Sequence, residues 1–483
     1  MTPSVLAGLE PAAVFGWFEA LCAIPHGSTR TRAISDFCME FARARGLRCR
    51  QDASNNVLIW KDASPGCEGR PTVILQGHLD MVCEKEPDCD IDFRTDGLRL
   101  AVDGDRIFAR GTTLGGDDGI AVAYALAILD SRTIRHPPLE VIFTTDEEIG
   151  MLGAAALEVP DVKGRILLNI DSEEEGVLTV SCAGGATCTI AVPYLSAPAA
   201  GQLYRLEVSG LTGGHSGVEI HKGRANANKV LGEALQLLTN ACSLRLAGIW
   251  GGSKDNAITR SAYALFVAPA AEESRIQSVT AAYERELREL YAAADPDLHM
   301  VCRPDNTGVA EVWDQESSER IIRLLNEVPN GVQAMSRDIE GLVETSLNLG
   351  IVKVTGDTLE LTFSVRSSVG RDKEYLTAVL RSIAERYGAV YFQKGDYPAW
   401  EYRKDSPLRE LMVQVYEEQY GEKPQVIAIH AGLECGLLAG KLPGLDSVSF
   451  GPNLTEIHTT RESMSIASVA RTWRYLLTVL ERL

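Results

Sequence analysis

Histidine and carboxylate side chains follow three short apolar runs of the sequence, at the point where each run ends. The runs are predicted to be buried strands, and the groups that follow them are His78 and Asp80 after residues 73–75, Glu147 and Glu148 after residues 139–143, and Asp171 after residues 166–170. In an open α/β sheet, ligands bind beyond the carboxyl ends of the strands, so these groups are expected to meet in one crevice. That much negative charge in one crevice is costly unless cations neutralise it.

Two further groups stand where they can join this cluster. Asp117 and Asp118 begin an apolar helix expected over residues 120–129, where a single carboxylate would be enough to cap the free amides. His458 lies in the polar loop 451–462. A mixed set of imidazole and carboxylate ligands suits zinc, and also manganese or cobalt, and the supply of ligands predicts two metal ions.

Each of these patterns also has an ordinary structural explanation. The spacing of His78 and Asp80 puts both side chains on the same side of an extended segment, where the carboxylate can accept a hydrogen bond from the imidazole with or without a metal. Glu147 and Glu148 can equally form a solvated turn, and His458 alone would be an ordinary loop histidine. The joint occurrence of these groups at equivalent strand ends is what predicts a metal centre.

The composition narrows the class of protein. The chain has 483 residues, enough for roughly two or three domains, and its 47 basic and 66 acidic residues give a net charge of −19. A charge of this sign repels nucleic acid and anionic membranes, and no apolar run is long enough to span a bilayer, so no nucleic acid and no membrane is expected as a partner. The eleven scattered cysteines form no CxxC pair, and no Lys or Arg precedes Arg30, which favours a reduced, cytoplasmic protein without a basic signal peptide.

The order of patterns predicts a split domain with an insertion. Residues 1–183 alternate helical and strand patterns, and residues 396–483 return to them. Between them, residues 184–395 carry alternating strands and longer helices, and Gly184 and Gly185 at the junction are interpreted as a hinge. We therefore expect an α/β fold with a mostly parallel central sheet flanked by helices, interrupted by an inserted α+β lid domain.

Six motifs, taken in order, give the sequence a resemblance to a known family. They are QGHLDMV at 76–82, GTTLGGDDGI at 111–120, TTDEEIGM at 144–151, NIDSEEEG at 169–176, GLTGGHSG at 210–217 and EIHTTRE at 456–462. Over nearly its whole length the chain resembles the dinuclear-zinc metallopeptidases, which include aminoacyl-histidine dipeptidases and, more distantly, tripeptidases, aminoacylases and glutamate carboxypeptidases. The resemblance implies a zinc-exopeptidase-like catalytic domain.

Carried over position by position, the resemblance implies a dinuclear metal site. It implies that Asp117 bridges two Zn²⁺ ions per subunit, that His78 and Asp171 complete one site and Glu148 and His458 the other, that Glu147 is the general acid and base, and that Asp80 orients His78. Mn²⁺ or Co²⁺ can substitute for zinc. The family also has a cis peptide bond after its bridging aspartate, here between Asp117 and Asp118.

Other positions are implied to bind the substrate. The resemblance assigns His215 to the oxyanion, Asn256 and Arg366 to the C-terminal carboxylate, and Gly432 to a glycine-rich loop at 429–436 that also carries His430 and Glu434. An arginine on a strand can equally be a surface charge, so the role of Arg366 stays open. The long lid implies that His215 acts within its own subunit, and the family is compatible with a homodimer.

The function expected from this resemblance is a metal-dependent dipeptidase of broad specificity. It would hydrolyse unblocked dipeptides, including Xaa-His and β-alanyl-histidine, by a hydroxide that bridges the two zinc ions, with Glu147 as the general acid and base. An N-acyl amino acid amidohydrolase of the same fold stays open, and an acidic group near the substrate amine, with Glu173, Glu174 and Glu175 as candidates, would favour the dipeptidase. A non-catalytic zinc-binding protein is a third alternative, against which the presence of Glu147 and of every ligand argues. The preferred dipeptide, the native metal and the oligomeric state are left open by the sequence.

Overall fold

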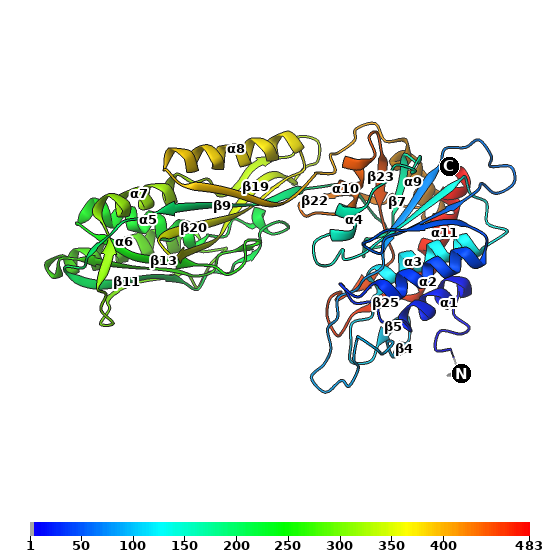
Figure 1. The fold of residues 1–483 in the computed structure, drawn as a ribbon, viewed down its shortest axis with the longest axis horizontal. Helices are drawn as coiled ribbons and strands as arrows, with labels where there is room; N and C mark the ends of the chain where they lie inside the picture. The colour runs from blue at the N-terminus through cyan, green and yellow to red at the C-terminus, as the bar shows by residue number, and fades with distance from the viewer. Residues whose placement is uncertain (1–3) are drawn as a thin grey trace. The chain divides into compact units, whose positions relative to one another are not determined.

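The computed structural model describes residues 4–483, and the chain forms two compact units (Figure 1). The first unit combines the chain up to Cys182 with Tyr402–Ala428 and Leu433–Leu483, and the second combines Ala183–Glu401 with Ile429–Gly432. Most of the second unit corresponds to the insertion expected at 184–395. The short segment Ile429–Gly432, which the sequence analysis groups with the last part of the chain, lies with the second unit.

An eight-stranded sheet forms the centre of the first unit. Its strands follow the order β1 (Arg48–Gln51), β2 (Val57–Lys61), β6 (Leu139–Thr144), β3 (Val73–His78), β7 (Ile166–Asn169), β23 (Asp446–Ser449), β8 (Val177–Cys182) and β22 (Gln425–Ile429). A smaller sheet joins β24 (Leu454–Thr455), β25 (Ser463–Ser465), β5 (Arg106–Ala109) and β4 (Leu100–Asp103).

The four central strands of the large sheet are parallel, because β6 pairs with β3, β3 with β7 and β7 with β23 in that sense. Strands β1, β2 and β8 pair antiparallel. A short turn with Asn55 in the left-handed region joins β1 to β2, and a turn this short can connect only antiparallel strands. The α/β class is therefore confirmed, but the sheet is mixed, with its parallel part confined to the centre.

Helices cover this sheet and share its apolar core. They are α1 (Ala12–Cys22), α2 (Arg32–Ala44), α3 (Gly116–Asp130), α9 (Pro407–Tyr420) and α11 (Ile466–Arg482), while α4 (Leu152–Ala156) and α10 (Glu434–Lys441) contact each other. Every residue from Ile120 to Leu129 is buried, because α3 packs against both β3 and α1. This packing fixes the start of α3, where Asp117 lies.

The second unit is built on a nine-stranded antiparallel sheet. Its order is β16 (His299–Pro304), β11 (Gln202–Ser209), β15 (Ala262–Ala268), β13 (Arg245–Gly251), β19 (Val343–Thr355), β20 (Thr358–Ser367), β9 (Gly184–Pro193) and β21 (Val390–Tyr397), and β18 (Gly331–Met335) pairs with β19. Helices α5 (Ala227–Ala241), α6 (Glu273–Leu290), α7 (Gln315–Glu327) and α8 (Gly370–Arg386) share a second apolar core with this sheet (Figure 1). Two short pairs complete the unit: β10 (Ser196–Pro198) with β17 (Glu311–Trp313), and β12 (Gly214–His215) with β14 (Ala257–Ile258).

Gly184 and Gly185 do not form a hinge. Both lie inside β9, paired with Ser367 and Arg366 of β20. A Cβ atom on Gly184 would lie 2.5 Å from the backbone nitrogen of Ala399, and one on Gly185 would crowd a tyrosine ring of β21. Glycine is required here because another chain segment approaches closely, and the hinge interpretation is wrong for these two residues.

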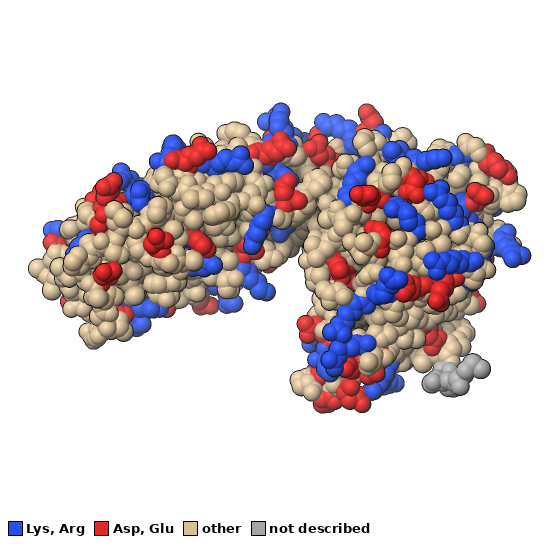
Figure 2. Space-filling model, viewed as in Figure 1, with Lys and Arg blue, Asp and Glu red and all other residues tan. Residues whose placement is uncertain are grey.

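The surface shown in Figure 2 carries acidic and basic side chains side by side, without a large area of one sign. All eleven cysteines of the sequence lie in the described part of the chain, and none of them forms a disulfide bond. Within residues 4–483, no helix is both long enough and apolar enough to cross a membrane.

Candidate metal centre

The predicted ligands of the first unit lie at the carboxyl ends of three neighbouring parallel strands. Strand β3 ends with His78, the loop after β6 carries Glu147 and Glu148, and Asp171 follows β7. The parallel register places His78 opposite Thr144, the last residue of β6, so the strands end at one edge of the sheet. Groups that are far apart in the sequence therefore meet in one place.

His78 is buried and its ring is held in one orientation. Its Nδ1–H donates a hydrogen bond to the backbone carbonyl of Asp80 at 2.9 Å, and the Asp80 carboxylate lies 3.6 Å away. Its Nε2 faces two carboxylates, with Asp117 Oδ1 at 3.1 Å and Asp171 Oδ1 at 3.8 Å. A histidine oriented in this way by a neighbouring group is the usual arrangement of a metal ligand.

Asp117 lies between the two histidines of the cluster. Its Oδ1 faces His78, and its Oδ2 lies 3.1 Å from Nε2 of His458. The same nitrogen of His458 is 3.0 Å from Oε2 of Glu148. The two oxygens of this carboxylate thus lie next to different histidines, an arrangement that a ligand bridging two cations would need.

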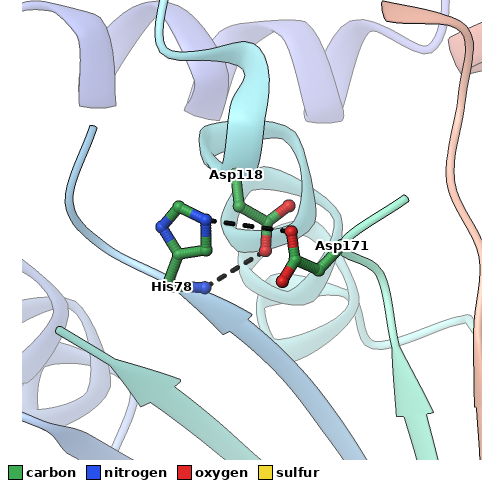
Figure 3. Close-up of side chains that lie close together, drawn as sticks. All are labelled: His78, Asp118 and Asp171. Carbon is green, nitrogen blue, oxygen red and sulfur yellow. Dashed lines mark hydrogen bonds and ion pairs between the residues drawn. The ribbon is translucent and has the colours of Figure 1, made fainter. Parts of the chain in front are cut away.

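Asp118, which follows Asp117, is a second candidate ligand. Figure 3 shows Asp118 close to His78 and Asp171, and the possible ligand atoms of these three residues lie within 4.8 Å of one another. However, Asp118 Oδ2 accepts a hydrogen bond from the backbone N–H of His78 at 3.1 Å, and burial raises the pKa of this carboxyl well above its usual range. Because this oxygen of Asp118 is already hydrogen-bonded to the backbone, whereas both carboxylate oxygens of Asp117 lie next to histidine nitrogens, Asp117 is the better candidate. The Asp117–Asp118 peptide bond is cis, as the resemblance implies.

The two loops that complete the cluster contain residues in the left-handed region. His458 has a φ of 61°, and Asp146, directly before Glu147, has a φ of 54°. Non-glycine residues adopt this region at a cost, and such residues concentrate at functional sites. The Asp146 carboxylate holds its loop by accepting a hydrogen bond from the Thr29 N–H at 2.6 Å.

Asp80 positions the segment that follows β6 as well as His78. Its carboxylate is fully buried and accepts hydrogen bonds from the Glu147 N–H at 3.0 Å, the Glu148 N–H at 3.4 Å and the Ser28 hydroxyl at 2.8 Å. One carboxylate therefore sets the positions of the proposed general base and of a proposed ligand.

Glu462 holds the loop on the other side of Asp117, a role that the sequence analysis misses. Its carboxylate accepts hydrogen bonds from the N–H groups of Leu114 at 2.8 Å, Gly115 at 3.1 Å and Gly116 at 2.8 Å, with the Asp117 N–H at 3.4 Å. The sequence does contain a signal, because Glu462 ends the motif that carries His458. Consecutive amides that point at one acceptor are recognisable only in three dimensions.

A third buried carboxylate, Glu434, connects two of the strand ends. Its Oε2 accepts hydrogen bonds from Gln76 of β3 at 2.5 Å and from the Thr144 hydroxyl of β6 at 2.6 Å, and Asn169 of β7 donates to Gln76. Burial raises the pKa of Glu434 to about 7. From the sequence, this residue is recognisable only as part of the glycine-rich loop, because the partners that define its position lie about 290 to 360 residues away in the chain.

Without a cation, the electrostatics of the cluster favour bound protons. Burial raises the pKa of Glu147 to about 8, and it also raises the pKa of Asp171 well above its usual range. Hydrogen bonds to Asp117 and Glu148 raise the pKa of His458 to about 10. For His78, burial alone would lower the pKa, but the carboxylates of Asp117 and Asp80 outweigh it and raise it. A divalent cation would take the place of these protons, and imidazole with carboxylate is a donor set that fits zinc, manganese or cobalt.

The four residues expected to bind substrate lie in the second unit. His215 is in β12, Asn256 directly precedes β14, Arg366 is in β20, and Gly432 lies in the loop before α10. The backbone carbonyl of Asn256 accepts a hydrogen bond from the Ser216 N–H at 2.9 Å. His215 and Asn256 are therefore adjacent.

The hydrogen bonds of two histidine rings in this unit, those of His215 and His430, describe the surroundings of the proposed substrate-binding residues. His215 Nδ1 accepts hydrogen bonds from the N–H groups of Gly217 and Val218, both at 3.2 Å, so the proton of the neutral ring is on Nε2. His430 Nε2 lies 2.7 Å from the Ser346 hydroxyl, and its buried Nδ1 has no hydrogen-bond partner. Burial and the charge of Arg366 lower the pKa of His215, and they lower that of His430 to about 3.

Of the three glutamates after Asp171, one is already paired. Glu175 binds the Arg471 guanidinium through two hydrogen bonds of 2.5 Å each. Glu173 and Glu174 are exposed, and the partial burial of its carboxyl raises the pKa of Glu173 to about 6, with the charge of Asp117 adding to the effect. Glu173 is the better candidate to face a substrate amine.

We predict that the affinity for zinc decreases as the pH decreases. Glu147 and His458 hold protons at pH 7 in the metal-free protein, and a cation must displace them. Each displaced proton makes the affinity change about tenfold per pH unit. Isothermal titration of the metal-free protein with Zn²⁺ at pH 6, 7 and 8, in two buffers of different ionisation enthalpy, gives both the affinity and the number of protons released.

The His458→Ala variant is the control, and it should bind zinc more weakly and release fewer protons. Equal affinity at pH 6 and pH 8 would contradict displacement of protons by the cation.

The chain is similar to known proteins over most of its length. Residues 74–482 match the model of Peptidase family M20/M25/M40. The chain is 37% identical over 482 residues to the cytosol non-specific dipeptidase of Escherichia coli (strain K12), covering 99% of each chain. It is also 37% identical to the aminoacylhistidine dipeptidase from Vibrio alginolyticus, whose crystal structure it matches with a TM-score of 0.94 over 100% of this chain and 98% of that one.

A solved structure with a much lower sequence identity has a similar fold. An aminopeptidase from Bacillus cereus ATCC 10987 is 15% identical and matches with a TM-score of 0.57, covering 98% of each chain. At this identity, the likeness concerns the fold alone. The family match spans most of the chain and the relatives from Escherichia coli and Vibrio span nearly all of it, so this protein belongs to Peptidase family M20/M25/M40.

Proposed function

We propose that the protein is a metal-dependent dipeptidase that hydrolyses unblocked dipeptides, Xaa-His among them, with two Zn²⁺ ions per subunit. The observation that carries the proposal is the position of Asp117 between His78 and His458, with Glu147 beside Glu148. The names of the two full-length relatives, a non-specific dipeptidase and an aminoacylhistidine dipeptidase, support the substrate class.

The residues present fit two cations. His78, Asp117 and Asp171 would hold one, and Asp117, Glu148 and His458 the other. Mn²⁺ or Co²⁺ would suit the same donors. When bound, such cations make a water molecule acidic and polarise the carbonyl of the scissile bond.

Glu147 is the residue that moves the proton. Asp80 fixes its backbone, and the carboxylate is largely shielded from water. In the metal-free protein it holds a proton, because burial raises its pKa to about 8. Nearby divalent charge lowers the pKa of a carboxyl group, so Glu147 is then free to take a proton from the attacking water and deliver it to the departing amine.

His215 can donate a hydrogen bond to the oxyanion that develops during the attack. Its proton is on Nε2, because Nδ1 is occupied by two backbone N–H donors. Burial and Arg366 keep the ring neutral by lowering its pKa, so it remains a donor of fixed orientation.

Arg366, Asn256 and the loop of Gly432 are proposed to bind the C-terminal carboxylate of the dipeptide. A buried donor without a hydrogen-bond partner, Nε of Arg366, supports this role. Unsatisfied buried donors are costly, and a carboxylate is the group that a guanidinium matches best.

We predict that Glu147→Gln removes activity without removing metal. A general base contributes about 10²-fold to 10⁴-fold to the rate, and the amide cannot accept the proton. The measurement is kcat for Ala-His, β-Ala-His, Leu-Gly and Gly-Gly, with N-acetylated amino acids alongside, before and after chelation, and the metal content of each protein.

Wild-type cleavage of free dipeptides that chelation abolishes is the expected result. Turnover of N-acetylated amino acids alone would replace the dipeptidase proposal with an amidohydrolase. A Glu147→Gln variant as active as the wild type would contradict its role.

We predict that Arg366→Ala raises KM for dipeptides with a free carboxylate. The loss of a charge-assisted bidentate contact is expected to cost about tenfold to a hundredfold. The C-terminal amide of Ala-His should be affected much less, because it lacks the charge. Arg371→Ala, on an exposed arginine of α8, is the matched control. An equal change for Ala-His and its amide would count against carboxylate recognition.

We further propose a cytoplasmic homodimer in which His215 acts within its own subunit. Mixing Glu147→Ala chains with His215→Ala chains tests the second point, and no recovery of activity is expected. Activity that returns on mixing would mean that each subunit lends His215 to its partner. Sedimentation of the wild-type protein reports the oligomeric state independently.

A further inference from the structure

The segment that carries Asn256 has little regular structure of its own. Strands β12 and β14 are two residues each, and their pairing joins His215 to Ala257 and Gly214 to Ile258. A ladder this short is marginal, because a few backbone hydrogen bonds do not offset the conformational entropy of a loop. Another group must keep Asn256 and His215 in place.

Asn348 of β19 supplies that group. Its side chain is 1% exposed, and its Nδ2 donates one hydrogen bond to the backbone carbonyl of Asp255 at 2.9 Å and another to that of Ala257 at 2.8 Å. The two acceptors flank Asn256 on either side. Both hydrogens of one amide are therefore used to hold one residue.

The restraint extends from Asn256 to His215. The carbonyl of Asn256 accepts a hydrogen bond from the Ser216 N–H at 2.9 Å, and His215 pairs with Ala257. A shift of the 255–257 backbone would therefore move His215 as well. The backbone at Gly350 also packs closely against this segment, since a Cβ atom on Gly350 would lie 2.5 Å from the Asp255 carbonyl oxygen.

The side chain of Asn348 is itself held by a hydrogen bond from Asn226. Its Oδ1 accepts a hydrogen bond from Nδ2 of Asn226 at 3.1 Å, and Asn226 also donates to the Leu349 carbonyl at 3.0 Å. In the β19–β20 ladder, Asn348 lies opposite Ser364. Two residues earlier on the same strand, and so on the same face of it, Ser346 contacts His430. One strand thus supports three of the groups near the proposed carboxylate site.

We propose that Asn348 is a positioning residue for substrate binding, which sets Asn256 and His215 through the backbone of residues 255–257. The inference rests on the proposed function of those two residues. The amide has no substitute of equal shape, because an aspartate at this position would present acceptors to two carbonyl oxygens, and a smaller residue would leave both unpaired.

The test is the steady-state kinetics of Asn348→Asp and Asn348→Ala with Ala-His, together with metal content and the midpoint of thermal unfolding. The expected result is a rise in KM of about tenfold or more, the cost of two lost hydrogen bonds, with a fall in kcat and with unchanged metal content. The control is Asn326→Ala, which removes an amide that also donates to two backbone carbonyls, those of Gly232 and Ile322, away from the site. This control should leave KM unchanged.

A purely structural role would lower the fraction of active protein, and therefore kcat, without changing KM. Wild-type KM in both Asn348 variants would overturn the proposal. A double-mutant cycle adds a second criterion, because Asn348→Ala should raise KM much less in the Asn256→Ala background. If Asn348→Ala raised KM by the same factor in the Asn256→Ala background as in the wild type, the proposal would also be overturned. If the wild type fails to cleave dipeptides while binding metal, the proposed function fails first, and the Asn348 proposal falls with it.

Discussion

The first unit depends on one electrostatic constraint: several carboxylates and two histidine rings lie within a few ångströms of one another in a largely buried place. Asp117 touches both His78 and His458, while Asp171 and Glu148 lie on either side. Such a cluster is stable only when protons or cations separate the negative groups. The raised pKa values of Glu147, Asp171 and His458 are the sign of that requirement in the metal-free protein.

The rest of the first unit can be understood as the means of keeping these groups together. Parallel strands β6, β3 and β7 end at one edge, and three buried carboxylates tie the ends and loops to each other. Asp80 holds the segment of Glu147, Glu462 holds the loop before Asp117, and Glu434 joins β3 to β6. Each of these carboxylates accepts at least two hydrogen bonds, which offset part of the cost of its burial. The second unit uses the same principle with an uncharged amide, since Asn348 holds the backbone on both sides of Asn256.

Much of the fold and of the proposed metal centre could be predicted from the sequence, because both depend on local signals. Apolar runs mark β3, β6 and β7, and an acidic or histidine residue follows each within a few positions. The supporting residues could not be predicted in the same way. Glu434 and Asn348 are defined by partners distant in the chain, and nothing in their own neighbourhoods distinguishes them. The place of Gly184 and Gly185 cannot be predicted for a related reason: a pair of glycines has the same sequence in a hinge and in a crowded strand, and only the close approach of residues such as Ala399 distinguishes the two.

The central claim is that Asp117, and not its neighbour Asp118, joins two cations. The most direct measurement is a crystal structure of the zinc-loaded protein with anomalous data collected on both sides of the zinc absorption edge. The arrangement described here predicts two zinc peaks, one beside His78 and Asp171 and one beside Glu148 and His458, with one oxygen of Asp117 on each. A single peak, or two peaks bridged by Asp118, would contradict it.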